Sequence, residues 1–526
     1  MRGAIAAGSP ETAAAGAELL AQGGNAVDAA VAAAFASFIA EGDISNIGGC
    51  GFALVCTPQG EATVYDFFAN VPGLGRGKDR PLDFQAVTVD FGDATQVFHV
   101  GRASAAVPGN VAGLCTLLEE QGTMPLSQVL APAIRLAREG FHLAPPRAFI
   151  LKLLEPIFTY TPSLARRYTI NGRFASEGDL IRMPRLAETL EWLAQEGPDL
   201  FYTGPIGQAI VADQEAHGGL ITAADLAYYR VYRCAPIRLD YRGHTILMPP
   251  PPSTGGALIA FSLKLLESLD LSDVDHASTR HLTILAEVMR LTNQARQRWE
   301  ALSRLGGTER VTAFLDDAVV ASYCADLTEA LARPGRGSDA PRSGGPANTT
   351  HISVADRDGL IVSLTTTPGE SAGFIIGETG VTLNNLMGEA DLHPRGFHQD
   401  PPGIRLASMM APTIVLEGGR PVLALGSGGS NRLRTAILQV LNNLLDFPLS
   451  LEQAVLAPRV HFEEGTLHLE GGYNPLVADE LEAMGYQVNR WRQRSLYFGG
   501  VHAVSRQNGT IKATGDPRRG GAVVIL

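Results

Sequence analysis

Hydrophobic residues recur with helical spacing over much of this chain. Two apolar stretches near its start, 11–22 and 26–40, predict buried helices, and Asn25 and Asp28 supply an N-terminal cap for the second. Four stretches in the middle of the chain show the same spacing: 125–139, 185–195, 205–217 and 281–305. A strand-like interruption at 237–248 ends in four prolines, which form a rigid turn into another helix. We therefore predict a largely helical middle segment.

Strand patterns return after that helical segment. The residues that follow position 348 alternate and predict a β-hairpin whose tip is Asp358-Gly359. A three-residue loop would set Thr349 opposite Thr367, whereas a two-residue loop would shift that partner by one position. Threonines that face each other across two strands can hydrogen-bond. Thr367 is therefore a candidate to orient Thr349, and the alternative is that it belongs to an ordinary Thr-rich strand end.

The junction before this hairpin carries the clearest chemical signal. Residues 333–348 are rich in Pro, Gly and Ser and predict a flexible segment that cannot pack a core. Cleavage of the Asn348–Thr349 bond would give Thr349 a free α-amine beside its hydroxyl. An α-amine titrates near pH ~7.7–8.0 and can therefore serve as the base that a threonine nucleophile needs. The alternative is that Thr349 is simply a β-branched strand residue after a linker.

A glycine-rich stretch, GSGGS at 426–430, lies between an apolar strand at 421–425 and an amphipathic helix at 432–445. Backbone N–H groups at the start of a helix favour negative charge, so this loop suits either an oxyanion hole or a phosphate cradle. The pattern GxxxxGK[ST] is missing, which argues against a nucleotide site. Strands and helices near both ends of the chain predict a layered sandwich of the α/β (α+β) class.

Composition narrows the class of protein further. The 526 residues are 45% hydrophobic and 18% charged, which is typical of a globular enzyme. The net charge of −12 argues against general binding to nucleic acid or membrane surfaces. Five widely spaced cysteines predict no disulfide framework, and the histidines show no metal-binding spacing. We therefore expect neither a metal nor a cofactor. No secretory signal is visible, so we expect a cytoplasmic protein.

Eight short motifs occur in order along nearly the whole chain. They are GGNAVDAAVA at 23–32, AVPGNVAGL at 106–114, GGLITAADLAYY at 218–229, PPPPSTGG at 249–256, NTTH at 348–351, LNN at 383–385, MMAPTIV at 409–415 and GSGGS at 426–430. With these motifs the chain resembles the γ-glutamyltransferase family of N-terminal-nucleophile hydrolases. The resemblance implies a four-layer αββα sandwich, and self-cleavage into a large fragment, 1–348, and a small fragment, 349–526, that form one composite domain.

The resemblance also implies roles for individual residues. Thr349 would be the nucleophile and the new N-terminus, and Thr367 would support it. Gly428 and Gly429 would donate the hydrogen bonds of the oxyanion hole. Ser408 would match one of two serines that bind the α-carboxylate of a substrate. The partners expected are a small-molecule amide, a water or amine acceptor and the second fragment of the same chain; the oligomeric state beyond that heterodimer stays open.

The chain departs from the family pattern at several candidate substrate-binding positions. The substituted or shifted positions are Phe68 for an arginine, Gly369 for an asparagine, Leu386 (after Asn385) for a polar residue, Ala407 for the first serine, and Glu389 near an amine-binding aspartate. Loss of a bidentate arginine removes a strong carboxylate contact. Arg405 or Arg432 could replace it, and the alternative for each is an ordinary structural or surface charge.

The sequence leaves three functions open. The first is a self-processing hydrolase or acyltransferase that cleaves a γ-glutamyl or similar small amide through an acyl-threonine ester. The second is an amidohydrolase on a non-glutamyl amide, as in the family's oxamate amidohydrolases and cephalosporin acylases. The third is a catalytically silent binding protein, which the joint presence of Asn348, Thr349, Thr367, Gly428 and Gly429 argues against.

Overall fold

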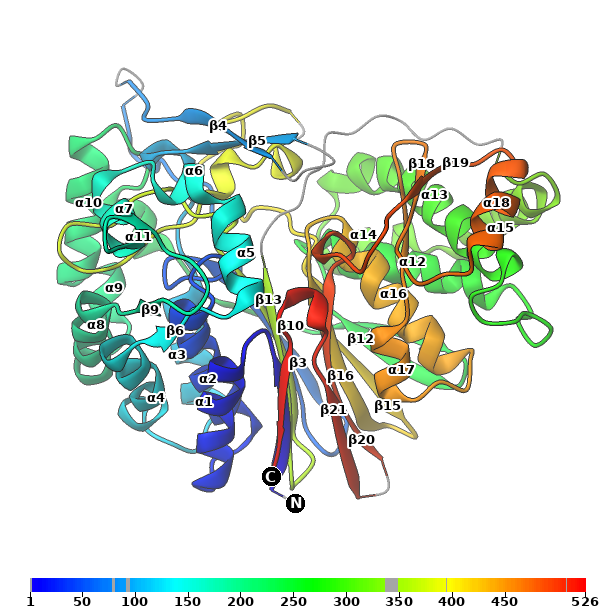
Figure 1. Ribbon diagram of the computed structural model, residues 1–526, viewed down its shortest axis with the longest axis horizontal. Coiled ribbons are helices and arrows are strands. Elements are labelled where there is room, and N and C mark those ends of the chain that lie inside the picture. The colour runs from blue at the N-terminus through cyan, green and yellow to red at the C-terminus, as the bar shows by residue number, and fades with distance from the viewer. Residues whose placement is uncertain (1, 78–80, 91–94, 336–348, 394, 508) are drawn as a thin grey trace.

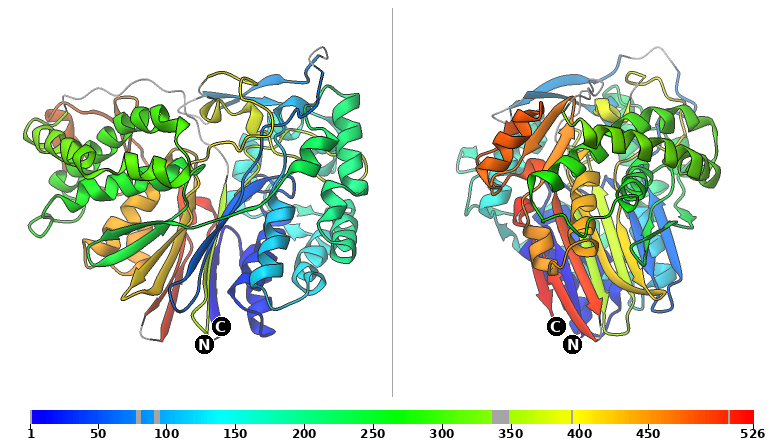
Figure 2. Two further views of the ribbon diagram at one scale, coloured as in Figure 1. Left: turned by 180° about the vertical axis from the view of Figure 1, so that it is seen from behind. Right: turned by 90° about the vertical axis from the view of Figure 1, so that its right-hand side faces the viewer.

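Two antiparallel β-sheets lie face to face at the centre of the molecule, with helices outside each of them (Figure 1). The computed structural model describes residues 2–77, 81–90, 95–335, 349–393, 395–507 and 509–526. Seen from behind, the two sheets again lie between helices on either side (Figure 2, left). The order of layers is therefore helix, sheet, sheet, helix, as the sequence predicted.

The first sheet has seven strands, and all of its described pairings are antiparallel. In spatial order the strands are β10 (Tyr232–Cys234), β3 (Ala62–Phe67), β2 (Cys50–Cys56), β14 (Ile361–Thr367), β13 (Thr350–Asp356), β1 (Gly3–Ala7) and β22 (Ala522–Ile525). Every residue of β1, β2, β13 and β14 is buried, because the second sheet covers one face and helices cover the other. Strands β14, β13 and β22, from after residue 348, pair with strands β2 and β1 from before it.

The second sheet has six antiparallel strands. In order they are β11 (Ile237–Tyr241), β12 (His244–Met248), β15 (Thr413–Glu417), β16 (Arg420–Gly428), β20 (Gly500–Gln507) and β21 (Thr510–Thr514). The strand-like interruption expected at 237–248 is thus a hairpin, β11–β12, at the edge of this sheet. Strand β16 packs on β13 and β14 of the first sheet, so the middle strands of the two sheets face each other.

The predicted helices are all present, with ends shifted by a few residues, and the helices at 110–121 and 451–456 were not predicted. Those on the side of the first sheet are α1 (Pro10–Ala21), α2 (Ala26–Ala40), α3 (Asn110–Gln121), α4 (Leu126–Glu139), α8 (Pro184–Glu196) and α10 (Pro205–Ala216). Those on the side of the second sheet are α12 (Thr254–Glu267), α13 (Thr279–Ala301), α16 (Arg432–Leu445) and α17 (Leu451–Leu456). Helix α2 contacts β13 and β14, and α16 contacts β16 and β20.

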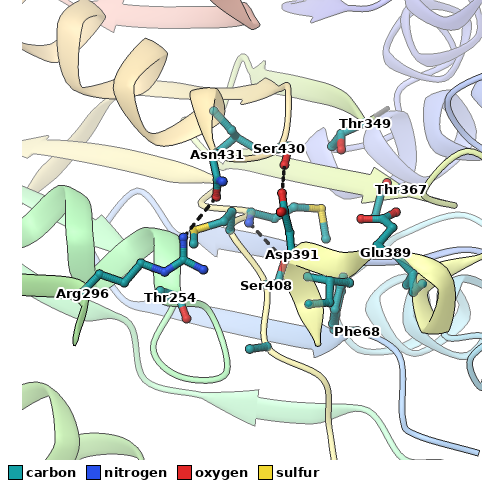
Figure 3. Close-up of a pocket in the computed structure, with 16 residues that line it drawn as sticks. Phe68, Thr254, Arg296, Thr349, Thr367, Glu389, Asp391, Ser408, Ser430 and Asn431 are labelled. Carbon is teal, nitrogen blue, oxygen red and sulfur yellow. Dashed lines mark hydrogen bonds between the residues drawn. The ribbon is translucent and has the colours of Figure 1, made fainter. Parts of the chain in front are cut away.

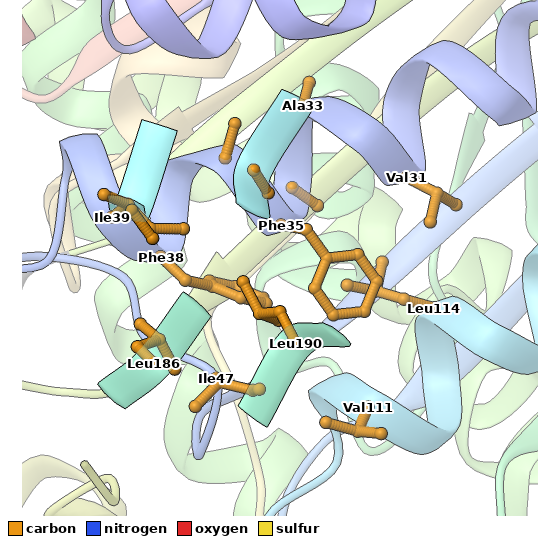
Figure 4. Packing of buried hydrophobic residues seen from close by; sticks show 14 of the residues in the cluster. Val31, Ala33, Phe35, Phe38, Ile39, Ile47, Val111, Leu114, Leu186 and Leu190 are labelled. Atoms are coloured by element: carbon orange, nitrogen blue, oxygen red, sulfur yellow. The ribbon is translucent and has the colours of Figure 1, made fainter. Parts of the chain in front are cut away.

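Helix α2 is the centre of the larger hydrophobic core. All 15 of its residues are buried, and Phe35 and Phe38 pack among side chains of α3 and α8 such as Leu114 and Leu190 (Figure 4). Its N-terminus has the predicted capping box: the Asn25 side chain accepts from two backbone N–H groups, and the Asp28 carboxylate accepts from the Asn25 N–H at 2.8 Å. This rigid helix supports the back of strand β13.

The hairpin β13–β14 has the three-residue loop that the sequence allowed. Thr350 pairs with Thr366, and the same register runs to the Asp356 N–H, which donates to the Leu360 carbonyl at 3.1 Å. The Asp356 carboxylate accepts from three backbone N–H groups of the turn at 2.9–3.0 Å and from the Ala26 N–H at 3.0 Å. This register places Thr349, one residue before the strand, opposite Thr367.

The glycine-rich loop is shorter than expected. Residues 426–428 belong to strand β16, where Gly428 pairs with Gly500 of β20, so only Gly429 to Asn431 connect strand to helix. The glycines are needed because the two sheets approach closely here. A Cβ on Gly426 would lie 2.3 Å from the His351 ring. The oxyanion donors proposed from sequence therefore sit at a strand end rather than within a helix N-terminus.

Candidate active site

Thr349 and Thr367 lie beside each other at the ends of neighbouring strands (Figure 3). Only 4% of Thr349 and 5% of Thr367 is exposed, and both line one pocket. The Thr367 hydroxyl oxygen accepts from the Gly369 N–H at 3.0 Å, which fixes the turn that follows β14. Asn348, the other half of the expected cleavage site, lies outside the described residues.

Gly428 packs directly on the main chain of the candidate nucleophile. A Cβ added to it would lie 2.1 Å from the Thr349 carbonyl oxygen, so no side chain fits there. Gly429 has a φ of +128°, in the region that only glycine adopts readily, and a Cβ there would meet the Gly499 Cα at 3.1 Å. Gly428 thus packs on the main chain of Thr349, and Gly429 is the next residue along the chain. Their role as donors of an oxyanion hole stays a prediction.

A buried acid supports the strand just behind the nucleophile. Thr350 and Thr12 each donate a hydroxyl hydrogen bond to the Glu41 carboxylate, at 2.6 and 2.5 Å. Burial raises the pKa of Glu41, and the nearby Arg147 and the two hydroxyl hydrogen bonds act against that rise. Glu41 lies at the end of α2 and more than 300 residues from Thr350, so no sequence spacing pointed to it.

The pocket around the two threonines is small, with a volume of ≈ 60 Å³. This volume is the space open to the centre of a water molecule, of which one water needs about 10–15 Å³. The pocket therefore suits a few waters or a small acyl group. Sequence-predicted residues that line it are Phe68, Thr349, Thr367, Leu386, Glu389, Ala407 and Ser408. Lining residues that sequence reasoning missed include Thr254, Arg296, Asp391, Ser430 and Asn431. Thr254 and Ser430 lie inside recognised motifs, which was the available signal for them.

Two acids face this pocket. Burial and the neighbouring Asp391 raise the pKa of Glu389 to about 8. Burial and the charge of Glu463 raise the pKa of Asp391 to about 6, against the opposing effect of Arg432. Ser430 donates its hydroxyl to the Asp391 carboxylate at 3.1 Å (Figure 3). Glu389 is therefore largely protonated at neutral pH, while Asp391 is largely charged.

Of three other residues predicted to bind the substrate, Ser408 lines the pocket, whereas Asn385 and Gly369 do not. Ser408 lines the pocket, and its hydroxyl oxygen accepts from the Met410 N–H at 3.1 Å. Asn385 is fully buried beneath the pocket, where its carbonyl oxygen accepts from the Glu370 N–H at 2.8 Å. Gly369 has a φ of +65°, and a Cβ on it would overlap Asn385 and Glu389. Asn385 and Gly369 are not among the residues that line the pocket, and they pack against Glu389, which is.

The arginines proposed to replace the missing one do not line the pocket. Arg405 forms an ion pair with Asp66 at 3.4 Å and donates to the Phe68 carbonyl, so it holds the end of β3. Arg432 lies over the Tyr497 ring, 4.8 Å from its centroid. Arg296 of α13 is the cation among the described lining residues; it pairs with Glu300 at 3.2 Å.

The described part of the chain shows neither a metal cluster nor a membrane-spanning helix. No group of three or more His, Cys, Asp or Glu side chains is placed there to hold a metal ion. None of the helices described combines the length and apolar character needed to cross a bilayer.

Two features define the class of the protein. The layers are arranged αββα, and Thr349, at the start of a buried strand, lies beside Thr367 and Gly428. Both are features of an N-terminal-nucleophile hydrolase. The model of the gamma-glutamyltranspeptidase family matches residues 12–526, and the chain belongs to that family. It is accordingly an enzyme, a self-processing hydrolase or acyltransferase. The family assignment from the eight motifs is confirmed.

The curated relatives of this chain include acylases and glutathione hydrolases. An acylase ACY 1 proenzyme of a Pseudomonas species (strain SE83) is 35% identical, over 100% of this chain and 94% of that protein. A glutathione hydrolase proenzyme of Escherichia coli is 33% identical, over 90% of this chain and 83% of that protein. The solved cephalosporin acylase from Bacillus halodurans has a TM-score of 0.84 at 24% identity, over 99% of this chain and 95% of that one, and shows the shared fold.

Proposed function

We propose that the mature enzyme hydrolyses or transfers a small acyl group that lacks the α-amino-acid zwitterion, through an ester on Thr349. The Thr349 hydroxyl oxygen attacks the amide carbonyl, and its proton passes to the α-amine of the same residue. Collapse of the tetrahedral intermediate breaks the C–N bond, and the amine returns the proton to the leaving group. Water or an amine then attacks the ester and releases an acid or a new amide.

The observation that carries this proposal is the wall made by Phe68. Its ring lines the pocket and stacks on Phe52, with ring centroids 5.6 Å apart, where the family resemblance leads us to expect an arginine. Arg405 cannot take over, since Asp66 and backbone carbonyls hold it. A buried carboxylate without its cation is penalised by several kcal/mol, whereas one hydrogen bond from Ser408 returns about 1 kcal/mol.

A γ-glutamyl amide is the second candidate. Glu389 and Ser408 line the pocket and match residues that the family uses for the head group, and Arg296 supplies a positive charge in the same pocket. The glutathione hydrolase relatives favour the same substrate class by name. Against it stands the position of Arg296, which already pairs with Glu300 and donates to the Asn431 side chain at 3.4 Å.

The test compares three p-nitroanilides that differ only in the acyl group: L-γ-glutamyl, glutaryl and butyryl. We expect kcat/KM for the butyryl compound to exceed that of the γ-glutamyl compound at least tenfold. Phe68→Arg should raise kcat/KM for the two carboxylate compounds and leave the butyryl compound unimproved, while Phe68→Leu serves as the size control. A micromolar KM and a clear preference for γ-glutamyl in the wild type would refute the proposal.

We also propose how the protein exists in the cell. Self-cleavage would give fragments 1–348 and 349–526 that stay together as a heterodimer, because both fragments contribute paired strands to the seven-stranded sheet. The net charge of −12 argues against nucleic-acid or membrane-surface partners. We keep a cytoplasmic location as a proposal. Light scattering of the purified enzyme would give the oligomeric state, and cell fractionation would test the location.

A further inference from the structure

The side chain of Arg519 is buried directly behind the glycine turn. Only 1% of the residue is exposed, and it is not among the described residues that line the pocket. A Cβ added to Gly429 would lie 3.4 Å from the Arg519 Nη2. A Cβ added to Gly428 would lie 3.4 Å from the Arg519 Cδ, and the same Cβ would lie 2.1 Å from the Thr349 carbonyl oxygen. The arginine therefore lies against the backbone that packs on the nucleophile.

The neighbouring strand β20 leaves room for this side chain. Gly500 pairs with Gly428, and a Cβ on Gly500 would lie 2.8 Å from the Arg519 Cβ and Cγ. The Ser427 hydroxyl joins the two strands, because its oxygen accepts from the Gly500 N–H at 3.1 Å and its hydrogen is donated to the Gly428 carbonyl at 2.8 Å. The arginine and the glycine turn thus form one packed unit.

Arg519 lacks the partners that other buried arginines nearby have. Arg459 and Arg518 both pair with Asp516, at 2.7 and 3.1 Å. Arg519 forms no ion pair with any residue that the structure describes, and within that part of the chain its Nε and Nη1 have no hydrogen-bond partner. Its Nη2 donates to the Leu496 carbonyl at 3.5 Å. A buried cation without a paired anion costs stability, so its presence calls for a function.

The surrounding charges leave this guanidinium a cation. Burial and the like charges of Arg432 and Arg147 lower the pKa of Arg519 to about 9, while the charges of Asp516 and Glu370 act in the opposite direction. The group is therefore charged at neutral pH. Since it has no paired anion among the described residues, a negative charge that forms beside the glycine turn would be stabilised by it.

We propose that Arg519 is a positioning residue for acyl transfer, which holds the Gly428–Gly429 turn against Thr349 and acts through that turn on the oxyanion. The oxyanion forms when the Thr349 hydroxyl oxygen bonds to the amide carbon and the π electrons of the C=O bond move to its oxygen. It disappears when the carbonyl re-forms and the C–N bond breaks. This inference rests on the acyl-threonine chemistry of the proposed function, but not on which acyl group is carried.

The effect should fall on kcat and leave KM nearly unchanged. The carbonyl oxygen of the bound substrate carries no full charge before the attack, so Arg519 distinguishes the transition state from the ground state. A unit charge several ångströms from a developing charge, at an effective dielectric constant of about 20, changes a rate on the order of 10²-fold. We therefore expect a loss of kcat on the order of 10²-fold when the charge is removed.

Three variants at this position separate charge from volume. Arg519→Met and Arg519→Gln remove the charge, and both should lose kcat on the order of 10²-fold. Arg519→Lys keeps the charge and should recover most of that loss. Arg420→Met is the matched control, because Arg420 is exposed at the other end of strand β16, which ends at Gly428.

Thermal unfolding separates this role from a purely structural one. Replacement of an unpaired buried charge by an apolar residue of similar volume is often neutral or stabilising. Arg519→Met should therefore keep or raise the thermal midpoint while it lowers kcat. A lower midpoint together with an unchanged kcat per cleaved molecule would mean that Arg519 only fills space, and the inference would be overturned.

The assay uses the p-nitroanilide that the wild type cleaves best and counts the cleaved molecules from the two bands on a denaturing gel. A kcat within threefold of the wild type for a neutral variant would overturn the inference, as would an Arg519→Lys enzyme as slow as Arg519→Met. If Arg519→Met fails to fold, Arg519→Gln decides by the same criterion. A neutral variant that folds with the wild-type midpoint yet stays uncleaved would support the inference, because self-cleavage begins with the same attack by Thr349.

The result is independent of the comparison between acyl groups. A wild-type preference for γ-glutamyl over butyryl anilides would refute the proposed substrate class alone. The Arg519 variants would then be assayed on the γ-glutamyl compound, with the same expected loss of kcat.

Discussion

Substitution of Gly428 by alanine tests the site with the smallest possible change. The added methyl group would lie 2.1 Å from the carbonyl oxygen of Thr349, whereas ordinary van der Waals contact begins near 3.4 Å. The two groups must therefore separate by about 1.3 Å. Gly428 is fixed in strand β16 by its pairing with Gly500, so part of that shift has to fall on the nucleophile.

The size of the effect follows from this displacement. A misplacement of about 1 Å in a reacting group can lower the rate on the order of 10²-fold. Overpacking of a well-packed interior typically removes about 1–3 kcal/mol of folding stability. We therefore expect Gly428→Ala to fold, to self-cleave slowly, and to show turnover roughly 10²-fold below that of the wild type.

The assay follows two bands on a denaturing gel over time and then measures turnover of the fully cleaved fraction. Circular dichroism and thermal unfolding report whether the fold is intact. Gly77→Ala is the matched control, since a Cβ at that position has nothing within 4 Å. If Gly428→Ala matures and turns over like Gly77→Ala, the close approach of this strand to Thr349 plays no part in the chemistry.

Three further predictions concern the nucleophile, its neighbour and the buried acid. Thr349→Ala should give one band on a denaturing gel and Thr349→Ser two, and sequencing of the small fragment from the wild type should start at Thr349; another start would refute the assignment. Thr367→Ala should keep the fold, with a thermal midpoint lowered modestly because the Gly369 N–H loses its acceptor, while it slows cleavage and turnover; rates equal to those of the wild type would remove its orienting role. Because burial raises the pKa of Glu389 from 4.5 to about 8, the folded chain holds a proton that the unfolded chain has released, so stability should fall as the pH rises from about 5 to 8. In the uncleaved Thr349→Ala chain, adding Glu389→Gln should flatten this decline in thermal midpoint, and an unchanged slope would place the titration elsewhere.

Much of the architecture could be predicted from local patterns. The capped helix α2, the hairpin register and the helix at 432–445 followed from spacing and turn residues, because each depends on neighbours close in sequence. The glycine stretch was assigned wholly to a loop, and that was wrong for residues 426–428. Their pairing with β20, some 75 positions later, is a long-range contact that no local pattern reveals.

The sequence by itself determined the family, the fold class and the pair of threonines, since ordered motifs and a register of fixed period carry that information. Only the tertiary structure decided which charges surround the substrate. It held Arg405 against Asp66 and brought Arg296, Glu389 and Asp391 to one pocket. These contacts join segments that the two sheets bring together, and the protonation of a buried carboxyl depends on everything that surrounds it in space.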